Sequence, residues 1–166
     1  MPTSRAGLKL QANHRHPIAL SFIQLSPTDD PTIMILQHHL IAGAPDPVAP
    51  FSHAVEADGW VFLTGQMPFV GTSINESYPQ GITAQTHQVM HNLQKVLDGL
   101  ELSLAQVVQV RVYLLHFDSD YDAMNTVYAT YFAPGKRPAR TCVGVSGLAK
   151  GALIEIDMVA RRPSSA

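Results

Sequence analysis

The sequence predicts an α+β domain in which six strands form one sheet and two helices pack on one face of it. Residues 108–115 alternate apolar and polar side chains, as expected of a strand with one buried face. Residues 82–100 and 121–132 each repeat apolar side chains at helical spacing. The expected order is β-β-β-α-β-α-β-β, and two helices cannot cover both faces of six strands, so one face is left for water or a partner.

Composition limits the classes of function. The 166 residues suit one domain, and 46% of them are apolar and 14% charged, so the chain can build a core. So few charges favour an oligomer with part of its surface covered. The net charge of −2 and the scattered Lys and Arg residues argue against a nucleic-acid partner. Cys142 is the only cysteine, so no intramolecular disulfide can form, and no apolar run is long enough for a membrane helix. We therefore expect a cytoplasmic protein.

Residues 1–33 differ from the rest, because they carry four prolines and show neither helical nor strand periodicity. Three interpretations remain open: a disordered extension, a translation start placed too far upstream, or an organelle-targeting presequence. The basic residues without acids in the first 28 positions give the third some support. The predicted domain covers residues 34–163.

The first half of the domain predicts a short strand, a hairpin, a loop and a helix. Residues 35–41 can form the short strand. Residues 54–57 and 60–64 flank Asp58-Gly59, a strong signal for a type I′ hairpin turn. Residues 67–80 are rich in Pro, Gly, Ser and Asn and predict a loop. The helix over 82–100 has the apolar face Val89, Leu93, Val96, Leu97 and Leu100, with Gly99 as a candidate left-handed terminator.

The second half predicts a strand, a helix and two more strands. In the strand over 108–115 the apolar face is Val108, Val110, Val112 and Leu114. The helix over 121–132 has N-cap candidates Asp118, Ser119 and Asp120 and an apolar stripe of Met124, Val127, Tyr128, Tyr131 and Phe132. Pro134-Gly135 should stop this helix, and the last two strands fit residues 140–145 and 153–160.

Two strand segments carry candidate chemistry. Arg140 follows a proline at the start of a strand, and its planar fork can grip a carboxylate with two hydrogen bonds. The alternative is a strand arginine that pairs with an acid and fixes register. Glu155 and Asp157 share one strand face among apolar neighbours, where a raised pKa would let a carboxylate handle protons. The alternative is an amphipathic strand with its polar face in solvent.

Other candidates are weaker. His87 and His91 have metal-ligand spacing on the first helix, but a solvated helix face is the simpler interpretation. His38-His39 more simply belong to a strand ladder. Cys142 could be a nucleophile, but no base partner is visible, so a site-lining or buried thiol is favoured. The backbone of Gly65 could bind an anion or simply leave a strand.

Taken together, residues 35–162 resemble the reactive intermediate deaminase (Rid, or YjgF-like) family. The resemblance rests on segments that occur in the family's order and spacing: residues 49–55, 63–68, Gln85-Thr86, Asn92-Leu93, 125–128, Tyr131-Phe132, 138–140 and 154–156.

The resemblance implies a trimeric chorismate mutase-like fold with a mixed sheet, and a homotrimer whose active sites lie between subunits. It implies hydrolysis of 2-iminopropanoate and 2-iminobutanoate, or their enamine tautomers, to 2-oxo acids and ammonia, with no metal or organic cofactor. Arg140 would bind the substrate carboxylate and Glu155 would orient or activate water. The cleft would be lined by Phe51, Thr64, Asn125 and the backbone of Gly65 and Cys142.

Three positions depart from the family's pattern: Phe51 stands where tyrosine is usual, and Thr64 and Thr141 stand where serine is usual. A lost site hydroxyl can remove transition-state stabilisation, so the preferred substrate is in question. The alternatives are a related enzyme acting on another imine or enamine, and a non-catalytic or RNA-directed member.

Overall fold

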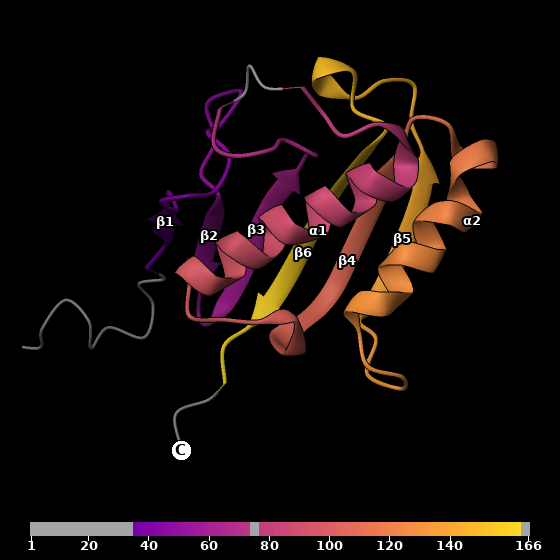
Figure 1. Cartoon of the computed structure of the whole chain (residues 1–166). Helices are drawn as coiled ribbons and strands as arrows, with labels where there is room; N and C mark the ends of the chain where they lie inside the picture. Colours follow the sequence, from indigo (N-terminus) through magenta and orange to yellow (C-terminus); the bar gives the residue numbers. More distant parts are fainter. Residues whose placement is uncertain (1–34, 74–76, 164–166) are drawn as a thin grey trace, which may run out of the picture. The chain divides into compact units, whose positions relative to one another are not determined.

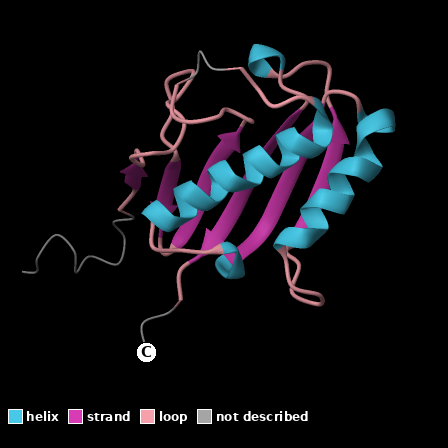
Figure 2. Cartoon of the chain, in the orientation of Figure 1, coloured by secondary structure: helices cyan, strands magenta, loops and turns pink. Residues whose placement is uncertain are grey.

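The computed structural model describes residues 35–73 and 77–163, and the interpretations offered for residues 1–33 lie outside these ranges. In the described part, six strands form one sheet with the spatial order β1-β2-β3-β6-β4-β5. Both long helices, α1 and α2, lie on the same face of this sheet (Figures 1 and 2). The predicted mixed sheet with two helices on one face is confirmed.

The element order along the chain also matches the prediction. The strands are β1 Gln37–His39, β2 Ala54–Ala57, β3 Trp60–Gln66, β4 Val107–Leu114, β5 Ala139–Gly144 and β6 Ile154–Arg161. The helices are α1 Gly81–Gly99 and α2 Phe117–Tyr128, with short 3₁₀ turns at Leu104–Gln106, Ala129–Tyr131 and Ala149–Gly151. β4 and β5 run parallel, whereas the other neighbouring strands run antiparallel.

The central strand β6 separates the two faces of the sheet. Its alternate side chains Ile154, Ile156, Met158 and Ala160 are at most 1% exposed and join the core beneath the helices. α1 completes this core with Val89, Met90, Leu93, Val96 and Leu97, all fully buried. The intervening residues Glu155, Asp157 and Val159 therefore face away from the helices. We call this second surface the open face.

The open face combines apolar and charged side chains. Trp60, Phe62 and Val143 are 43%, 49% and 41% exposed, although they lie on strands. Between them Asp157 accepts hydrogen bonds from Arg111 at 2.9 Å and from the Tyr113 hydroxyl at 3.2 Å. Exposed large apolar residues on a sheet are typical of a surface that another chain covers.

The hairpin between β2 and β3 has the predicted turn. Asp58 and Gly59 have φ angles of 49° and 74°, the two positive values that a type I′ turn requires. The turn fixes the register in which Ala54 pairs with Leu63 and Ala57 with Trp60. That register directs Val61 and Leu63 into the core.

Gly99 does not terminate α1 through a left-handed conformation, so that prediction is wrong. Gly99 is the last helical residue, and the positive φ of 58° belongs to Glu101. A side chain at position 99 would instead collide with the side chain of Ile41. The glycine is therefore required by close packing between the end of α1 and the segment after β1.

Val108 is also misassigned by simple alternation. Val107 pairs with Ala160 while Gln109 pairs with the adjacent Val159, so a β-bulge leaves one extra residue in β4. Val108 is consequently 41% exposed, and Val107, at 7%, takes the inward position. The other predicted inward residues of this strand, Val110, Val112 and Leu114, are fully buried.

Most element boundaries differ from the predictions by one or two residues, and those of β1 and α2 need comment. β1 covers only Gln37–His39 of the predicted range 35–41. α2 starts at Phe117, so Asp118 and Asp120 lie in its first turn and are not N-caps, and Ser119 donates to the His116 carbonyl. Acidic side chains in the first turn still interact favourably with the positive end of the helix dipole. The helix ends at Tyr128, and a 3₁₀ turn carries the chain to Tyr131.

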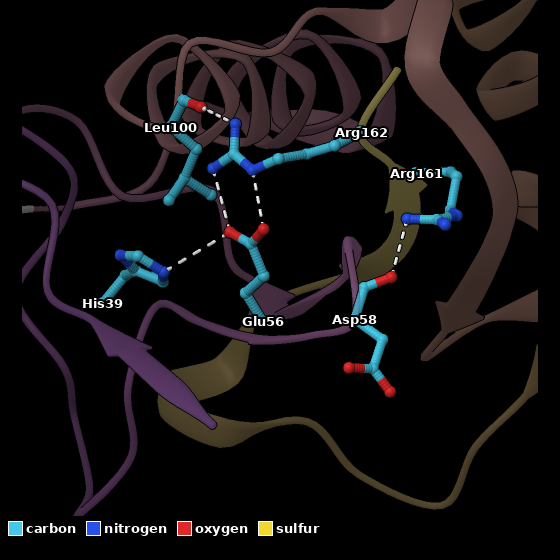
Figure 3. Close-up of polar contacts among 6 residues, drawn as sticks. All are labelled: His39, Glu56, Asp58, Leu100, Arg161 and Arg162. Atoms are coloured by element: carbon cyan, nitrogen blue, oxygen red, sulfur yellow. Dashed lines mark hydrogen bonds and ion pairs between the residues drawn. The ribbon is translucent and has the colours of Figure 1, made fainter. Parts of the chain in front are cut away.

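A charged cluster connects the end of β6 to the far edge of the sheet (Figure 3). Arg162 donates two hydrogen bonds to the Glu56 carboxylate, at 2.7 and 2.9 Å, and a third to the Leu100 carbonyl at 2.9 Å. His39 lies 3.8 Å from the same carboxylate. Because Glu56 is only 8% exposed, these contacts hold β2, β6 and the end of α1 together at one point.

Within the described ranges, neither long helix combines the length and apolar character that crossing a bilayer demands.

We predict that Arg162→Met lowers the free energy of unfolding by about 2–3 kcal/mol, because it leaves the buried Glu56 carboxylate without its partner. Arg161→Met is the matched control, since Arg161 donates only to the Asp58 carbonyl and lies over the Trp60 ring. Its expected cost is under about 1 kcal/mol. Urea unfolding at neutral pH measures both, and equal costs would contradict the prediction.

The same pair predicts the pH dependence of stability. The hydrogen bonds from Arg162 hold the pKa of Glu56 below its ordinary value of 4.5. A lowered folded-state pKa stabilises the fold above that ordinary value, and the contribution is lost as pH falls through the folded-state pKa. The difference in stability between wild type and Arg162→Met should therefore shrink on acidification.

Candidate functional site

The residues expected to form the site fall into two groups on different faces of the sheet. Gly65 lies against Glu155, Thr64 is its neighbour on β3, and Phe51 borders the same hollow as Gly65. Asn125 and Arg140 line a pocket beside α2. We call the first group the Glu155 half-site and the second the Arg140 pocket.

The Glu155 half-site depends on a β-bulge in β3. Leu63 pairs with Met158 and Gln66 pairs with Ile156, so β3 has one more residue than β6 between these pairs. Gly65 lies in this bulge, directly against the carboxylate of Glu155. Any side chain at position 65 would collide with that carboxylate. The absence of a side chain at Gly65 therefore leaves room for the Glu155 carboxylate and keeps the backbone of residue 65 accessible beside it.

Phe51 and Thr64 border the same region. Phe51 and Gly65 both line a hollow of about 10 Å³ between the 45–51 segment and the end of β3, a space no larger than one water molecule. The Thr64 hydroxyl donates to the Ser52 carbonyl at 2.7 Å, and the Thr64 amide donates to the His53 carbonyl at 3.0 Å. Thr64 thus fixes the segment that carries Phe51, and its hydroxyl is already engaged.

The two acids of β6 have different environments. Asp157 is paired with Arg111 and Tyr113, whereas no described residue among 35–73 and 77–163 donates a hydrogen bond to Glu155. Burial, and secondarily the charge of Asp157, raise the pKa of Glu155 above its ordinary value of 4.5. A carboxylate with a raised pKa is a stronger base, so Glu155 is better suited to accept a proton than an ordinary glutamate.

Two amides on α1 hold the loops around Glu155, a role that sequence reasoning did not assign. Asn92 is fully buried and donates to the carbonyls of Met67 and Phe69, both at 2.9 Å. Gln85 donates to the Pro79 carbonyl at 3.1 Å and accepts from the Leu153 amide at 2.9 Å. Both amides occur within the apolar stripe of a helix, and a polar residue at such a position is the signal that could have identified them.

Tyr78 is a second residue that the sequence did not single out. Its ring packs edge-on against Phe69 with centroids 5.0 Å apart, and its hydroxyl is 3.9 Å from the Met67 sulfur. Burial and the nearby charge of Glu155 raise the pKa of Tyr78 to about 12. The phenol is therefore protonated and can donate a hydrogen bond close to the half-site, which has phenylalanine at position 51.

The Arg140 pocket lies between β5 and α2. It encloses about 290 Å³ and is lined by Asn125, Tyr128, Ala129, Arg137, Pro138 and Arg140. The Arg140 guanidinium lies over the Tyr128 ring, 4.8 Å from its centroid. In the described part of the chain no carboxylate lies within ion-pair distance of Arg140. The alternative that Arg140 fixes register by pairing with an acid of the same chain is thus not supported.

Cys142 lies on the same face of β5 as Arg140, because the two are separated by one residue. Its side chain packs against the main core. Burial raises the pKa of the Cys142 thiol, and Arg140 opposes this shift. A raised pKa reduces the thiolate fraction, which disfavours a nucleophilic role for this half-buried thiol.

Two of the four histidine candidates, His87 and His39, have ordinary partners. His87 lies 2.8 Å from the Tyr131 hydroxyl, and His39 lies beside Glu56. In residues 35–73 and 77–163, no three His, Cys, Asp or Glu side chains are arranged to hold a metal ion. His53, within the segment used for the resemblance, accepts from the Ile41 amide and donates to the Pro45 carbonyl, so it organises the turn after β1.

A single chain does not bring Glu155 and Arg140 together. Glu155 is level with Tyr113 of β4, whereas Arg140 is level with Val110, three residues away. With β6, β4 and β5 side by side, strand geometry separates the two Cα atoms by about 14 Å. Arg140 shares the helix-covered face with Val110, but Glu155 lies on the open face. One small substrate cannot contact both side chains of the same chain.

Comparison with known proteins gives a consistent result. Residues 41–162 match the model of the family described as endoribonuclease L-PSP. A RutC family protein of Pyrococcus horikoshii is 41% identical over 117 residues, covering 70% of this chain and 90% of the relative.

Solved structures agree. A Rid family protein of unknown function from Yersinia pestis has a TM-score of 0.71 at 29% identity, covering 77% of this chain and all of the other. RidA from an Antarctic Psychrobacter has a TM-score of 0.70 at 29% identity, covering 76% and 99%.

We predict that NMR titration places the pKa of Glu155 above 4.5, and that Asp157→Asn lowers it by removing a nearby negative charge. Asp122→Asn, an exposed position on α2, is the control that removes the same charge far from β6. A Glu155 pKa that responds equally to both substitutions would contradict the assigned cause.

The raised pKa also predicts a stability gain. The folded state holds the Glu155 proton more tightly than the unfolded state, so stability falls as pH rises between the two pKa values and stays lower above them. Glu155→Gln removes this penalty, and it should raise the melting temperature at neutral pH but not at a pH below 4.5. A variant less stable than wild type at neutral pH would refute this.

Proposed function

Because the chain belongs to the Rid (YjgF-like) family, whose model is described as endoribonuclease L-PSP, we propose that it hydrolyses reactive 2-imino acids. Family membership supports a general imine or enamine deaminase role. The specific substrates that we propose are 2-iminopropanoate and 2-iminobutanoate, together with their enamine tautomers. The products are the corresponding 2-oxo acid and ammonia.

The observation that carries this proposal is the unpaired Arg140 guanidinium in a pocket with the Asn125 amide. A guanidinium donates two parallel hydrogen bonds to a carboxylate, and a partly desolvated site strengthens that pair. The proposed substrates carry such a carboxylate next to the imine carbon. Arg140 would therefore fix the position of the carbon that water attacks.

Glu155 would supply the base. Its carboxylate takes a proton from water while the water oxygen bonds to C2 of the protonated imine, giving a carbinolamine. Glu155 then returns its proton to nitrogen. As the C–N bond breaks and ammonia leaves, Glu155 takes the proton of the C2 hydroxyl, whose oxygen becomes the carbonyl oxygen, and this proton passes to the departing ammonia. The raised pKa of Glu155 suits these proton transfers. No metal or organic cofactor is required, because the imine carbon is already electrophilic.

The separation of Glu155 from Arg140 leads us to propose a homotrimer in which each site joins two chains. The Glu155 half-site of one subunit would face the Arg140 pocket of the next, and three equivalent sites would close the ring. Exposed Trp60, Phe62 and Val143 on the open face provide apolar surface for such contacts. The native mass should then be three times the 18.0 kDa of one chain.

We predict that Arg140→Ala and Arg140→Lys both lower kcat/KM by at least about 100-fold, because lysine keeps the charge but not the bidentate geometry. Serine or threonine dehydratase generates the enamine, and release of the 2-oxo acid is followed against the uncatalysed rate. Lys136→Gln is the control, since it removes a positive charge four residues away that does not line the pocket. Equal rates for wild type and Arg140→Ala would refute the proposal.

Complementation tests the shared site. Arg140→Ala and Glu155→Gln should each be inactive alone. In trimers assembled at random from equal amounts, about a quarter of intersubunit sites combine an intact Arg140 with an intact Glu155. Co-expression should thus restore about a quarter of wild-type activity. No recovery in mixed trimers, verified by native mass measurement, would contradict a site shared between chains.

The family's description also names RNA cleavage, which is the second candidate function. The net charge of −2 disfavours it. Salt-sensitive retention of RNA on filters, combined with inactivity toward both imines, would favour this candidate.

A third outcome concerns Phe51. If only the Phe51→Tyr variant hydrolyses small imines, the natural substrate of the wild-type protein is a different imine or enamine.

A further inference from the structure

The Arg140 pocket contains more positive charge and more donors than one carboxylate requires. Arg137 and Arg140 both line it, together with Asn125 and Tyr128. No acidic residue is among its lining residues in the described part of the chain. A concave surface with two guanidiniums and no carboxylate is complementary to a ligand with two negative charges.

The other arginines of the sheet region provide a comparison. Arg111 pairs with Asp157 and Arg162 pairs with Glu56, while Arg161 donates to the Asp58 carbonyl. Over residues 35–73 and 77–163, neither Arg137 nor Arg140 takes part in an ion pair or a hydrogen bond. The two guanidiniums without such partners are thus the two that share a pocket.

The Tyr128 ring forms one wall of this pocket. Arg140 lies over the ring, 4.8 Å from its centroid, and Tyr128 as a whole is 4% exposed. The Tyr128 hydroxyl is buried and has no hydrogen-bond partner in the described structure, so it is not accessible to a ligand in the pocket. The ring therefore supports Arg140, and the two arginines supply the positive charge of the pocket.

We propose that this pocket selects dicarboxylic 2-imino acids, with Arg140 on the carboxylate beside the imine and Arg137 on the carboxylate at the end of the side chain. This inference rests on the proposed deaminase function and specifies its substrate class. The second carboxylate takes no part in bond changes: water still adds to C2, and ammonia still leaves.

The dimensions of the pocket agree with such a ligand. Its volume of about 290 Å³ suits a small metabolite and is at the lower end of ligand sites. Arg137 and Arg140 are three residues apart, so their Cα atoms are separated by no more than about 10 Å. Two long side chains over that distance can reach the two ends of a four- or five-carbon dicarboxylate.

The test compares two imines. L-Aspartate oxidase generates 2-iminosuccinate and D-amino-acid oxidase generates 2-iminopropanoate from D-alanine, with catalase present to remove peroxide. Wild type should show kcat/KM at least about 10-fold higher for 2-iminosuccinate. Arg137→Gln should lower this ratio by about 10-fold or more. Lys136→Gln, a neighbouring cation outside the pocket, should leave the ratio unchanged.

A binding measurement separates the two proposals. Calorimetry with 2-oxoglutarate and 2-oxobutanoate reports the pocket without turnover, and the dicarboxylate should bind more tightly in an Arg137-dependent way. If neither imine is hydrolysed but this preference holds, the dicarboxylate pocket stands and the deaminase function fails. If 2-iminopropanoate is hydrolysed but no preference for the dicarboxylate exists, or Arg137→Gln leaves it intact, the inference is overturned and the deaminase function stands.

Discussion

The two-sided character of the central strand β6 is the constraint on which the rest of the structure depends. Every second side chain from Ile154 to Ala160 is buried under the helices, so the residues between them must face the other way. That alternation directs Glu155 and Asp157 to the face that the helices leave uncovered. A shift of one residue would bury both carboxylates in the core, which the apolar side chains of β6 prevent. The same strand therefore sets the core and the position of the acid.

The loops around Glu155 are fixed by polar contacts rather than by apolar packing alone. Asn92 and Gln85 extend from the buried side of α1 to backbone groups on both sides of the site. Buried amides are tolerated only when their hydrogen bonds are made, so these contacts specify one loop conformation. The charged cluster of Glu56 and Arg162 performs a similar role at the opposite end of the sheet. The core and its polar contacts thus position the site jointly.

Local sequence signals predicted most of the fold. They failed where contacts between residues far apart in the sequence determine the role or direction of a residue. Asp58-Gly59 specified its turn because backbone preference alone is sufficient there. Gly99 was misread because its reason is the side chain of Ile41, which is remote in sequence. Val108 was misread because a bulge depends on pairing with β6. For the site, residue types identified Arg140 and Glu155, but only the parallel pairing of β5 with β4 shows that they lie on different faces.

The placement of Arg140 and Glu155 on different faces of the sheet affects the energetics of the proposed trimer. In one chain Glu155 is partly buried with no donor, and Arg140 has no acidic partner in the described residues. Each group is therefore electrostatically incomplete, and neither can be satisfied by rearranging its own chain, because the rigid sheet lies between them. A neighbouring subunit that joins the two half-sites would place opposite charges across one cleft, where water is partly excluded and their attraction is stronger. Site formation would then add to the stability of the assembly, and binding of a carboxylate substrate would strengthen it further by mass action. The same geometry would make catalysis depend on assembly, since a dissociated chain could retain its fold and still lack a complete site.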